Sequence, residues 1–119
     1  MGIKREDYYI HVDGAFSGMI LPFVEDSQPF TFADGIDSIS ISGHKMIGSP
    51  IPCGVVMVYK EVSDKFSMEI EYISSHDKTI TGSRNALSAL ILWQAIRGIF
   101  YEDHKNRIKY CLDNAEFAV

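Results

Sequence analysis

The stretch IDSISISGHKMIGSPIPCGVVMVYK, residues 36–60, decides the fold of this chain. Its first part, 36–42, alternates isoleucine with polar residues at the period of a β-strand, and 54–60 is a second run rich in β-branched residues. Residues 43–53, between the two runs, include glycines and prolines, so the backbone must turn there and cannot continue either strand. We therefore expect two adjacent strands, joined by a turn that carries Lys45.

The sequence before this stretch predicts one more strand. The run YYIHVD, residues 8–13, is aromatic and β-branched and ends at Gly14, which is typical of a short buried strand that opens into a turn. Asp13 would then stand at the carboxyl end of this strand. Residues 15–26 are apolar but are interrupted by a glycine and a proline, which favours a loop or a short helix.

The sequence after it predicts two helices. Residues 85–100 are apolar nearly all round, which is the pattern of a helix buried on several sides, and Ser83 or Asn85 would cap its first turn. Residues 102–119 carry apolar side chains close to helical spacing, with charged residues between them. The apolar positions of this second helix are Ile108, Cys111, Leu112, Ala115, Phe117 and Ala118.

Composition limits the class of protein. The chain has 119 residues, of which 46% are hydrophobic and 23% charged, so we expect one folded domain, or part of one, rather than a disordered chain. The net charge of −5 disfavours nucleic acid as a partner. Cys53 and Cys111 have no paired or zinc-type spacing, which favours reduced thiols and a cytoplasmic setting. We expect no signal peptide and no membrane segment, because no stretch approaches roughly 18 apolar residues.

Two charged residues stand where chemistry is plausible. The amine of Lys45 could condense with a carbonyl group if its neighbours depressed its pKa, although most lysines are solvated surface charges. Asp13 at a strand end would need a cation such as a protonated ring nitrogen if buried; alternatively it is a helix cap or turn residue. His11 and His44 could be core histidines bonded to backbone or could contact a phosphate or a substrate.

Two motifs together resemble a known family. HVDGA, residues 11–15, followed by SGHK, residues 42–45, resembles the aspartate-to-lysine signature of the group II amino-acid decarboxylases, which depend on pyridoxal 5'-phosphate (PLP). The phrases GMILPFV, QPFTFADGIDSISISGHKMIGSPIPCG and HDKTITGSRN are similar to bacterial PLP-dependent histidine decarboxylases in particular. The resemblance implies an α/β fold, namely part of the large PLP-binding domain of fold-type I (aspartate aminotransferase-like) enzymes. Strands of β-branched residues with helices between them agree with an α/β fold.

The resemblance also implies roles for individual residues. Lys45 would form the Schiff base with PLP, Asp13 would pair with the pyridinium nitrogen and Ala15 would pack against the ring. The physics agrees, because PLP acts as an electron sink and a carboxylate keeps the ring nitrogen protonated.

Three more contacts follow from the resemblance alone. Ser42 and His44 would lie near the cofactor phosphate. Ser83 would reach the phosphate of the neighbouring subunit, since family members are dimers or higher homo-oligomers.

The implied activity is decarboxylation of an L-amino acid, with L-histidine giving histamine and CO2; serine decarboxylases form the nearest rival. Family members are longer, so we expect residues 1–119 to be a partial large domain without the upstream phosphate-binding segment and the C-terminal domain. The chain departs from the family pattern at Gly14, where an alanine is usual, and at 86–88, where glycine, histidine and a small hydroxyl residue are usual. An inactive truncated remnant of such an enzyme is the alternative.

Overall fold

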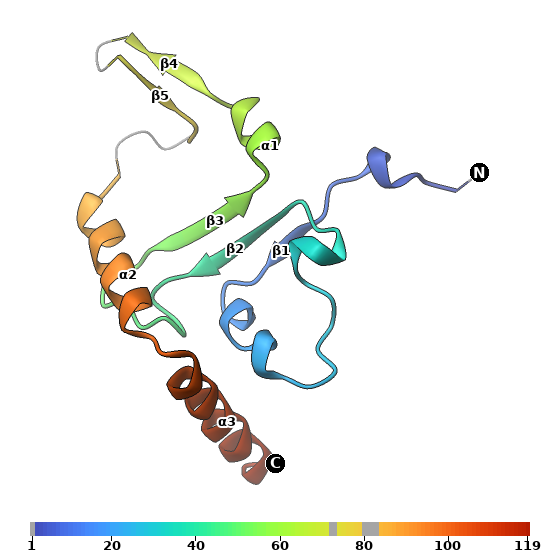
Figure 1. Cartoon of the computed structure of the whole chain (residues 1–119), viewed down its shortest axis with the longest axis vertical. Helices are drawn as coiled ribbons and strands as arrows, with labels where there is room; N and C mark the ends of the chain where they lie inside the picture. The colour runs from blue at the N-terminus through green and yellow to red at the C-terminus, as the bar shows by residue number, and fades with distance from the viewer. Residues whose placement is uncertain (1, 72–73, 80–83) are drawn as a thin grey trace.

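The computed structural model describes residues 2–71, 74–79 and 84–119, and its centre is a three-stranded sheet in the order β1-β2-β3 (Figure 1). β1 and β2 are parallel, with Asp13 opposite Ser40, whereas β2 and β3 are antiparallel. The strands are β1 His11–Asp13, β2 Ser38–Ser42 and β3 Gly54–Val58. The prediction of two adjacent strands joined by the turn of Lys45 is therefore confirmed.

All three predicted strands are shorter than expected, and β2 begins at Ser38 rather than at residue 36. Residues 8–10 do not belong to β1, because the Ile10 amide donates to the Asp37 carboxylate (2.6 Å) instead of continuing the ladder. Tyr59 and Lys60 do not belong to β3, because the chain turns there into a short helix, α1.

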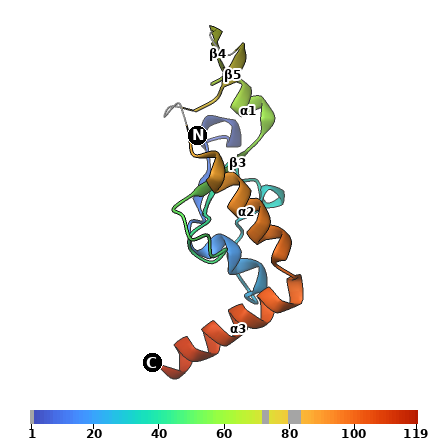
Figure 2. The same ribbon diagram turned by 90° about the vertical axis from the view of Figure 1, so that its left-hand side faces the viewer.

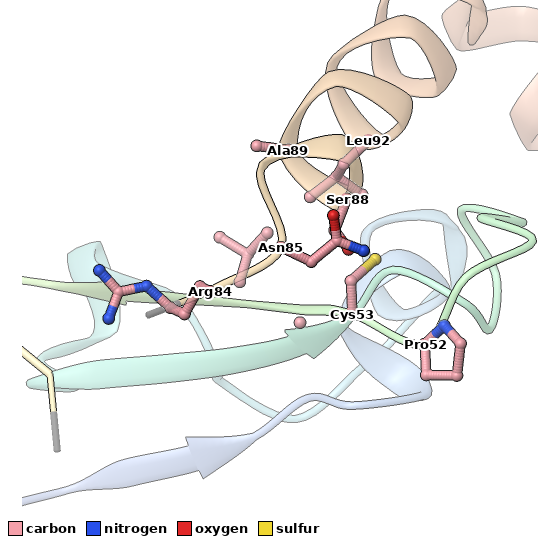
Figure 3. A pocket seen from close by; sticks show the side chains of 9 residues that line it. Pro52, Cys53, Arg84, Asn85, Ser88, Ala89 and Leu92 are labelled. Carbon is pink, nitrogen blue, oxygen red and sulfur yellow. The ribbon is translucent and has the colours of Figure 1, made fainter. Parts of the chain in front are cut away.

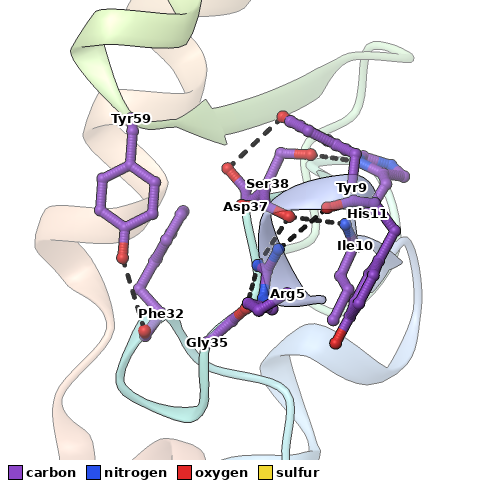
Figure 4. A network of polar contacts seen from close by, with 10 residues as sticks. Arg5, Tyr9, Ile10, His11, Phe32, Gly35, Asp37, Ser38 and Tyr59 are labelled. Atoms are coloured by element: carbon purple, nitrogen blue, oxygen red, sulfur yellow. Dashed lines mark hydrogen bonds and ion pairs between the residues drawn. The ribbon is translucent and has the colours of Figure 1, made fainter. Parts of the chain in front are cut away.

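Asp37 also ties the N-terminal segment to the sheet (Figure 4). The Arg5 guanidinium donates both to the Gly35 carbonyl (2.5 Å) and to the Asp37 carboxylate (2.8 Å). The hydrogen bond from the Ile10 amide, together with Arg5, lowers the pKa of Asp37. These contacts hold the start of β1 beside the start of β2 and so support the register that places Asp13.

The region between β1 and β2 contains short 3₁₀-helices, as predicted for 15–26. Pro22 stands in the first turn of one of them, where its missing N–H costs nothing. The 3₁₀-helices of the described chain are η1 Arg5–Asp7, η2 Ser17–Met19, η3 Leu21–Phe23 and η4 Phe32–Asp34.

The region after β3 forms α1 and a two-stranded antiparallel sheet, and no helix or strand was predicted for residues 61–84. Lys60 and Lys78 both bind the Asp64 carboxylate, at 2.7 and 2.5 Å, and lower its pKa to about 2. These ion pairs link α1 to the segment that follows the small sheet. The elements are α1 Lys60–Asp64, β4 Met68–Ile70 and β5 Ser75–Asp77.

Two helices complete the described chain, α2 Ala86–Gly98 and α3 Tyr101–Phe117. Asn85 caps α2, since its side chain accepts from the Leu87 amide at 2.9 Å; Ser83, the other predicted cap, lies outside the described residues. The prediction that this helix is buried on several sides is wrong for this chain, because none of its residues is buried. Only one of its sides faces the sheet region, and its other sides lack a covering layer (Figures 1 and 2).

Within the described chain, the buried residues of α3 lie in its first half. His104 and Ile108 are its buried residues, and the His104 Nε2–H donates to the Met19 carbonyl at 3.0 Å. The helix then extends away from the sheet, at the end of the molecule opposite β4 and β5 (Figure 2). The prediction of a helix over residues 102–119 is confirmed, with Tyr101–Phe117 as its bounds; of its apolar positions, Ile108 is buried whereas Leu112 and Phe117 are exposed.

The core of the described chain is small. The molecule is flat, with extents of 55 × 49 × 23 Å. None of the helices that the structure describes is long and apolar enough to cross a membrane. The buried hydrophobic residues are Ile36, Ile39, Ile47 and Ile108.

Candidate cofactor site

The carboxyl ends of β1 and β2 form the candidate site. Asp13 is the last residue of β1, and Ser42 is the last residue of β2. Because these strands are parallel neighbours, both residues stand at the same edge of the sheet, and Lys45 follows three residues after Ser42. In open α/β sheets, ligands bind outside this edge. The fold thus brings the two charged residues of the predicted site to one end of the sheet.

Asp13 is exposed and has one free acceptor oxygen within the described part of the chain. Its Oδ1 accepts from the Ala15 amide at 3.0 Å, so the turn role considered for it is real. The same Ala15 accepts, through its carbonyl, from the Ser42 amide at 3.1 Å. Ala15 therefore connects the ends of the two parallel strands, directly beside the carboxylate.

Lys45 lies on the turn after β2, with its side chain exposed. Its ammonium makes no hydrogen bond and no ion pair within residues 2–71, 74–79 and 84–119. The ring of its neighbour His44 turns back on the chain: Nδ1 lies 3.1 Å from the Cys53 carbonyl oxygen and 3.3 Å from the Cys53 amide nitrogen. His44 thus contacts the backbone but is exposed, so it is not the core histidine considered as one alternative, and its Nε2 makes no hydrogen bond within the described part of the chain.

The other histidine considered, His11, is not a core residue. It is exposed, and its Nδ1 lies 2.7 Å from the Ser38 hydroxyl oxygen.

A hollow of about 500 Å³ lies behind the turn, between its return segment and α2 (Figure 3). Cys53 points into it towards Asn85 and Ser88. None of the five predicted cofactor residues that the structure describes, namely Asp13, Ala15, Ser42, His44 and Lys45, lines it, so we regard it as the contact region between the turn and the helix. The lining residues are Pro52, Cys53, Gly54, Val55, Arg84, Asn85, Ser88, Ala89 and Leu92.

Two residues shape this turn although no such role was predicted for them, Ser49 and Cys53. Ser49 is buried, 5% exposed, and its backbone amide donates to the Gly43 carbonyl at 2.8 Å. The Cys53 carbonyl accepts from the Gly43 amide, also at 2.8 Å. The available signal was the pair of prolines at 50 and 52, which leaves few amide donors in the return segment.

Gly14, where the family usually has alanine, is buried beside the predicted site. A Cβ there would lie 3.0 Å from Ile39 Cδ1 and 3.1 Å from the Ser40 carbonyl oxygen. An alanine would thus require β2 to shift by a few tenths of an ångström. Residues 86–88, the second place where the chain departs from the family pattern, form the first turn of α2.

The residues at the sheet edge fit PLP. The free oxygen of Asp13 can accept from a protonated ring nitrogen, the free amine of Lys45 can bond to an aldehyde carbon, and the small Ala15 leaves room beside a flat ring. By contrast, no group of three or more His, Cys, Asp or Glu residues in the described chain could hold a metal ion. Ser83 lies outside the described residues.

The family model described as "Pyridoxal-dependent decarboxylase conserved domain" matches residues 2–118. The chain belongs to this family.

Curated relatives are similar over the whole chain. The histidine decarboxylase of Morganella morganii is 68% identical over 118 residues, which are 99% of this chain and 31% of that protein. The histidine decarboxylase of Raoultella ornithinolytica is 60% identical over 119 residues, which are 100% of this chain and 52% of that protein. The chain therefore spans about a third to a half of the length of these relatives.

Solved structures confirm the fold. The L-methionine decarboxylase of Streptomyces sp. 590, in complex with L-methionine methyl ester, has a TM-score of 0.81 and 32% identity, covering 92% of this chain and 26% of that chain. The sphingosine-1-phosphate lyase of Burkholderia pseudomallei has a TM-score of 0.73 and 27% identity, covering 87% of this chain and 26% of that chain. The predicted α/β fold of fold-type I PLP enzymes is thus confirmed.

Proposed function

We propose that the polypeptide that contains this chain is a PLP-dependent lyase that converts L-histidine to histamine and CO2. The observation that carries this proposal is the position of Asp13 and Lys45 at the same end of two parallel neighbouring strands. The choice of histidine is supported by the 68% identity to the histidine decarboxylase of Morganella morganii.

Asp13 and Lys45 would hold the cofactor at its ring nitrogen and its aldehyde carbon. PLP, when bound, supplies an electron sink for the electron pair that remains after CO2 leaves an amino acid. The Asp13 carboxylate holds a proton at the ring nitrogen and thereby keeps that sink effective. The Nζ of Lys45, which binds no described side chain, can carry a proton to or from the reacting carbon.

The remaining predicted contacts complete the proposal. Ala15 packs beside the ring, and Ser42 and the free Nε2 of His44 bind the phosphate. Ser83 contacts the cofactor of a second subunit, so we propose a homo-oligomer, a dimer or larger. Two free thiols, Cys53 and Cys111, support a reducing, cytoplasmic setting.

The second candidate is an inactive remnant, in which residues 1–119 are all that remains of such a domain. In that case nothing would cover the apolar face of α2, where Leu87, Leu90, Trp93 and Ile96 are each half exposed or more in the described chain. Such a face is expected to promote aggregation if nothing covers it. Sequencing beyond both ends of the coding region separates the candidates, because an open frame supports the enzyme and stop codons support the remnant.

Reduction with borohydride after addition of PLP tests the site. We expect a pyridoxyl group on the Lys45 peptide of the polypeptide expressed from its complete reading frame. Lys45→Arg should remove this label, whereas Lys65→Arg, at an exposed lysine beyond the end of α1, should keep it. Absence of the label from Lys45 refutes the proposed function. Release of CO2 from L-serine rather than L-histidine would replace histidine decarboxylase by serine decarboxylase.

A further inference from the structure

The backbone that carries Lys45 is closed into a loop. The Ser49 amide donates to the Gly43 carbonyl at 2.8 Å, which joins the two ends of residues 43–49. Within the loop, the Gly48 amide donates to the Lys45 carbonyl at 3.0 Å, and Gly48 has a φ of +81°, a conformation that suits glycine. The Lys45 backbone therefore sits inside two nested hydrogen bonds. Its side chain binds nothing among the described residues, so the backbone fixes the point from which the flexible side chain starts.

The Ser49 hydroxyl forms hydrogen bonds with the segment that follows this loop. It donates to the Ile51 carbonyl at 2.8 Å and accepts from the Ile51 amide at 3.3 Å. Pro50 and Pro52 have no amide hydrogen, so Ile51 supplies the only N–H group of residues 50–52. Without the hydroxyl, both polar groups of Ile51 lose these partners.

The hydrogen bonds of the Ser49 hydroxyl contribute to stability because Ser49 is buried. Ser49 is 5% exposed, although a serine has no reason to be buried unless its hydroxyl is bonded. Ile47, in the same loop, is also buried at 8% exposed and belongs to the small apolar core. Loss of the Ser49 hydroxyl would leave the N–H and C=O groups of the half-buried Ile51 without these partners, a cost that favours movement of the segment.

We infer that Ser49 is a positioning residue for Lys45: it holds the 43–49 loop in the one conformation that directs the lysine amine towards the carboxyl end of the sheet. This inference rests on the proposed function, because it concerns how Lys45 is presented to the cofactor. Ser49 itself touches neither cofactor nor substrate in this scheme. Its hydroxyl acts through the backbone of Ile51, whereas its backbone amide, which Ser49→Ala keeps, bonds Gly43.

The test compares Ser49→Ala with Ser38→Ala in the polypeptide expressed from its complete reading frame. Ser38 is a matched control, since it is also buried (3% exposed) and its hydroxyl oxygen lies 2.7 Å from His11 Nδ1 at the other end of β2. Without PLP, hydrogen exchange of the Ile51 amide should be at least about tenfold faster in Ser49→Ala and unchanged in Ser38→Ala.

With PLP, two further measurements apply. Because small displacements of a reacting group reduce rate strongly, kcat with L-histidine should fall by about tenfold or more in Ser49→Ala, with KM within about twofold. The pH midpoint of the visible absorbance of the lysine–cofactor Schiff base should also shift. Ser38→Ala should change neither. If Ser49→Ala does not fold, Ser49→Cys is measured by the same criteria.

The outcomes are distinct. A wild-type protein without a pyridoxyl group on Lys45 refutes the proposed function and this inference together. A labelled wild type, with Ser49→Ala equal to Ser38→Ala in amide exchange, kcat and pH midpoint, overturns the inference alone.

Discussion

Replacement of Gly43 by alanine is a sharp test of how the lysine turn packs on α2. A Cβ at this position would lie 2.5 Å from Cys53 Sγ and 2.8 Å from Leu92 Cδ1. Non-bonded heavy atoms prefer roughly 3.5–4.0 Å, so the neighbours would have to move by about 1 Å. The turn cannot retreat easily, because the Gly43 amide is bonded to the Cys53 carbonyl. Overpacking of this kind costs about 1–3 kcal/mol, and we expect about 2 kcal/mol for Gly43→Ala.

The assay is urea unfolding of the polypeptide expressed from its complete reading frame. Gly98→Ala is the matched control, because a Cβ there has no heavy atom within 4 Å and the residue ends a helix, so this variant should be as stable as wild type or slightly more stable. The double variant Gly43→Ala/Cys53→Ala removes the sulfur and should be more stable than the sum of the single changes predicts. The Leu92 methyl group can rotate away.

Two results would refute this reasoning. Equal stability of Gly43→Ala and Gly98→Ala would mean that the turn does not pack against Cys53 and α2 as described. Additive effects of the changes at Gly43 and Cys53 would mean that the sulfur is not the obstacle.

Three further outcomes are expected. Asp13→Asn keeps an acceptor for the Ala15 amide but removes the charge, so decarboxylation and PLP binding should fall while the melting temperature stays near that of wild type; an unchanged activity would contradict the proposed role. The two lysine partners of Asp64 lower its pKa to about 2. The stability that Asp64 contributes is therefore complete above the ordinary carboxyl pKa and is lost as the pH falls from about 4 to about 2. Acid unfolding of Asp64→Asn should lack this loss of stability. Asn85→Ala removes the cap of α2 and should cost about 1 kcal/mol in urea unfolding, whereas an unchanged midpoint would show that the cap is dispensable.

The sheet edge was predictable because its signals are local. Period-two alternation in 36–42 marks β2, and a strand that ends in a turn puts Asp13 at its carboxyl end. Ser49 had no periodic signal, since a polar residue buried by a turn belongs to no strand or helix pattern. The region of α1, β4 and β5 was missed for a related reason: these elements are short and mostly exposed, so no apolar alternation marks them.

The prediction for α2 failed for a different physical reason. An apolar surface all round a helix predicts that something covers it, but the pattern does not say which part of a polypeptide does so. In this chain Leu90 and Trp93 are 60% and 54% exposed, and Arg97 lies over the Trp93 ring at 5.0 Å. Since the chain spans 31% of the length of the Morganella morganii relative, the pattern is consistent with burial in a longer polypeptide.

The distribution of buried residues explains why some substitutions should reduce catalysis without reducing the stability of the fold. Ile36 and Ile39 flank the start of β2, and Ile47 and Ser49 lie in the turn that follows it, so much of the small core supports one strand and its turn. Asp13 and Lys45 are exposed at the end of this supported unit. Changes to the exposed pair should therefore reduce chemistry while the fold persists. Substitutions of the buried residues that support Asp13 and Lys45 should reduce the stability of the fold. Through the backbone of the turn, they should also reduce catalysis.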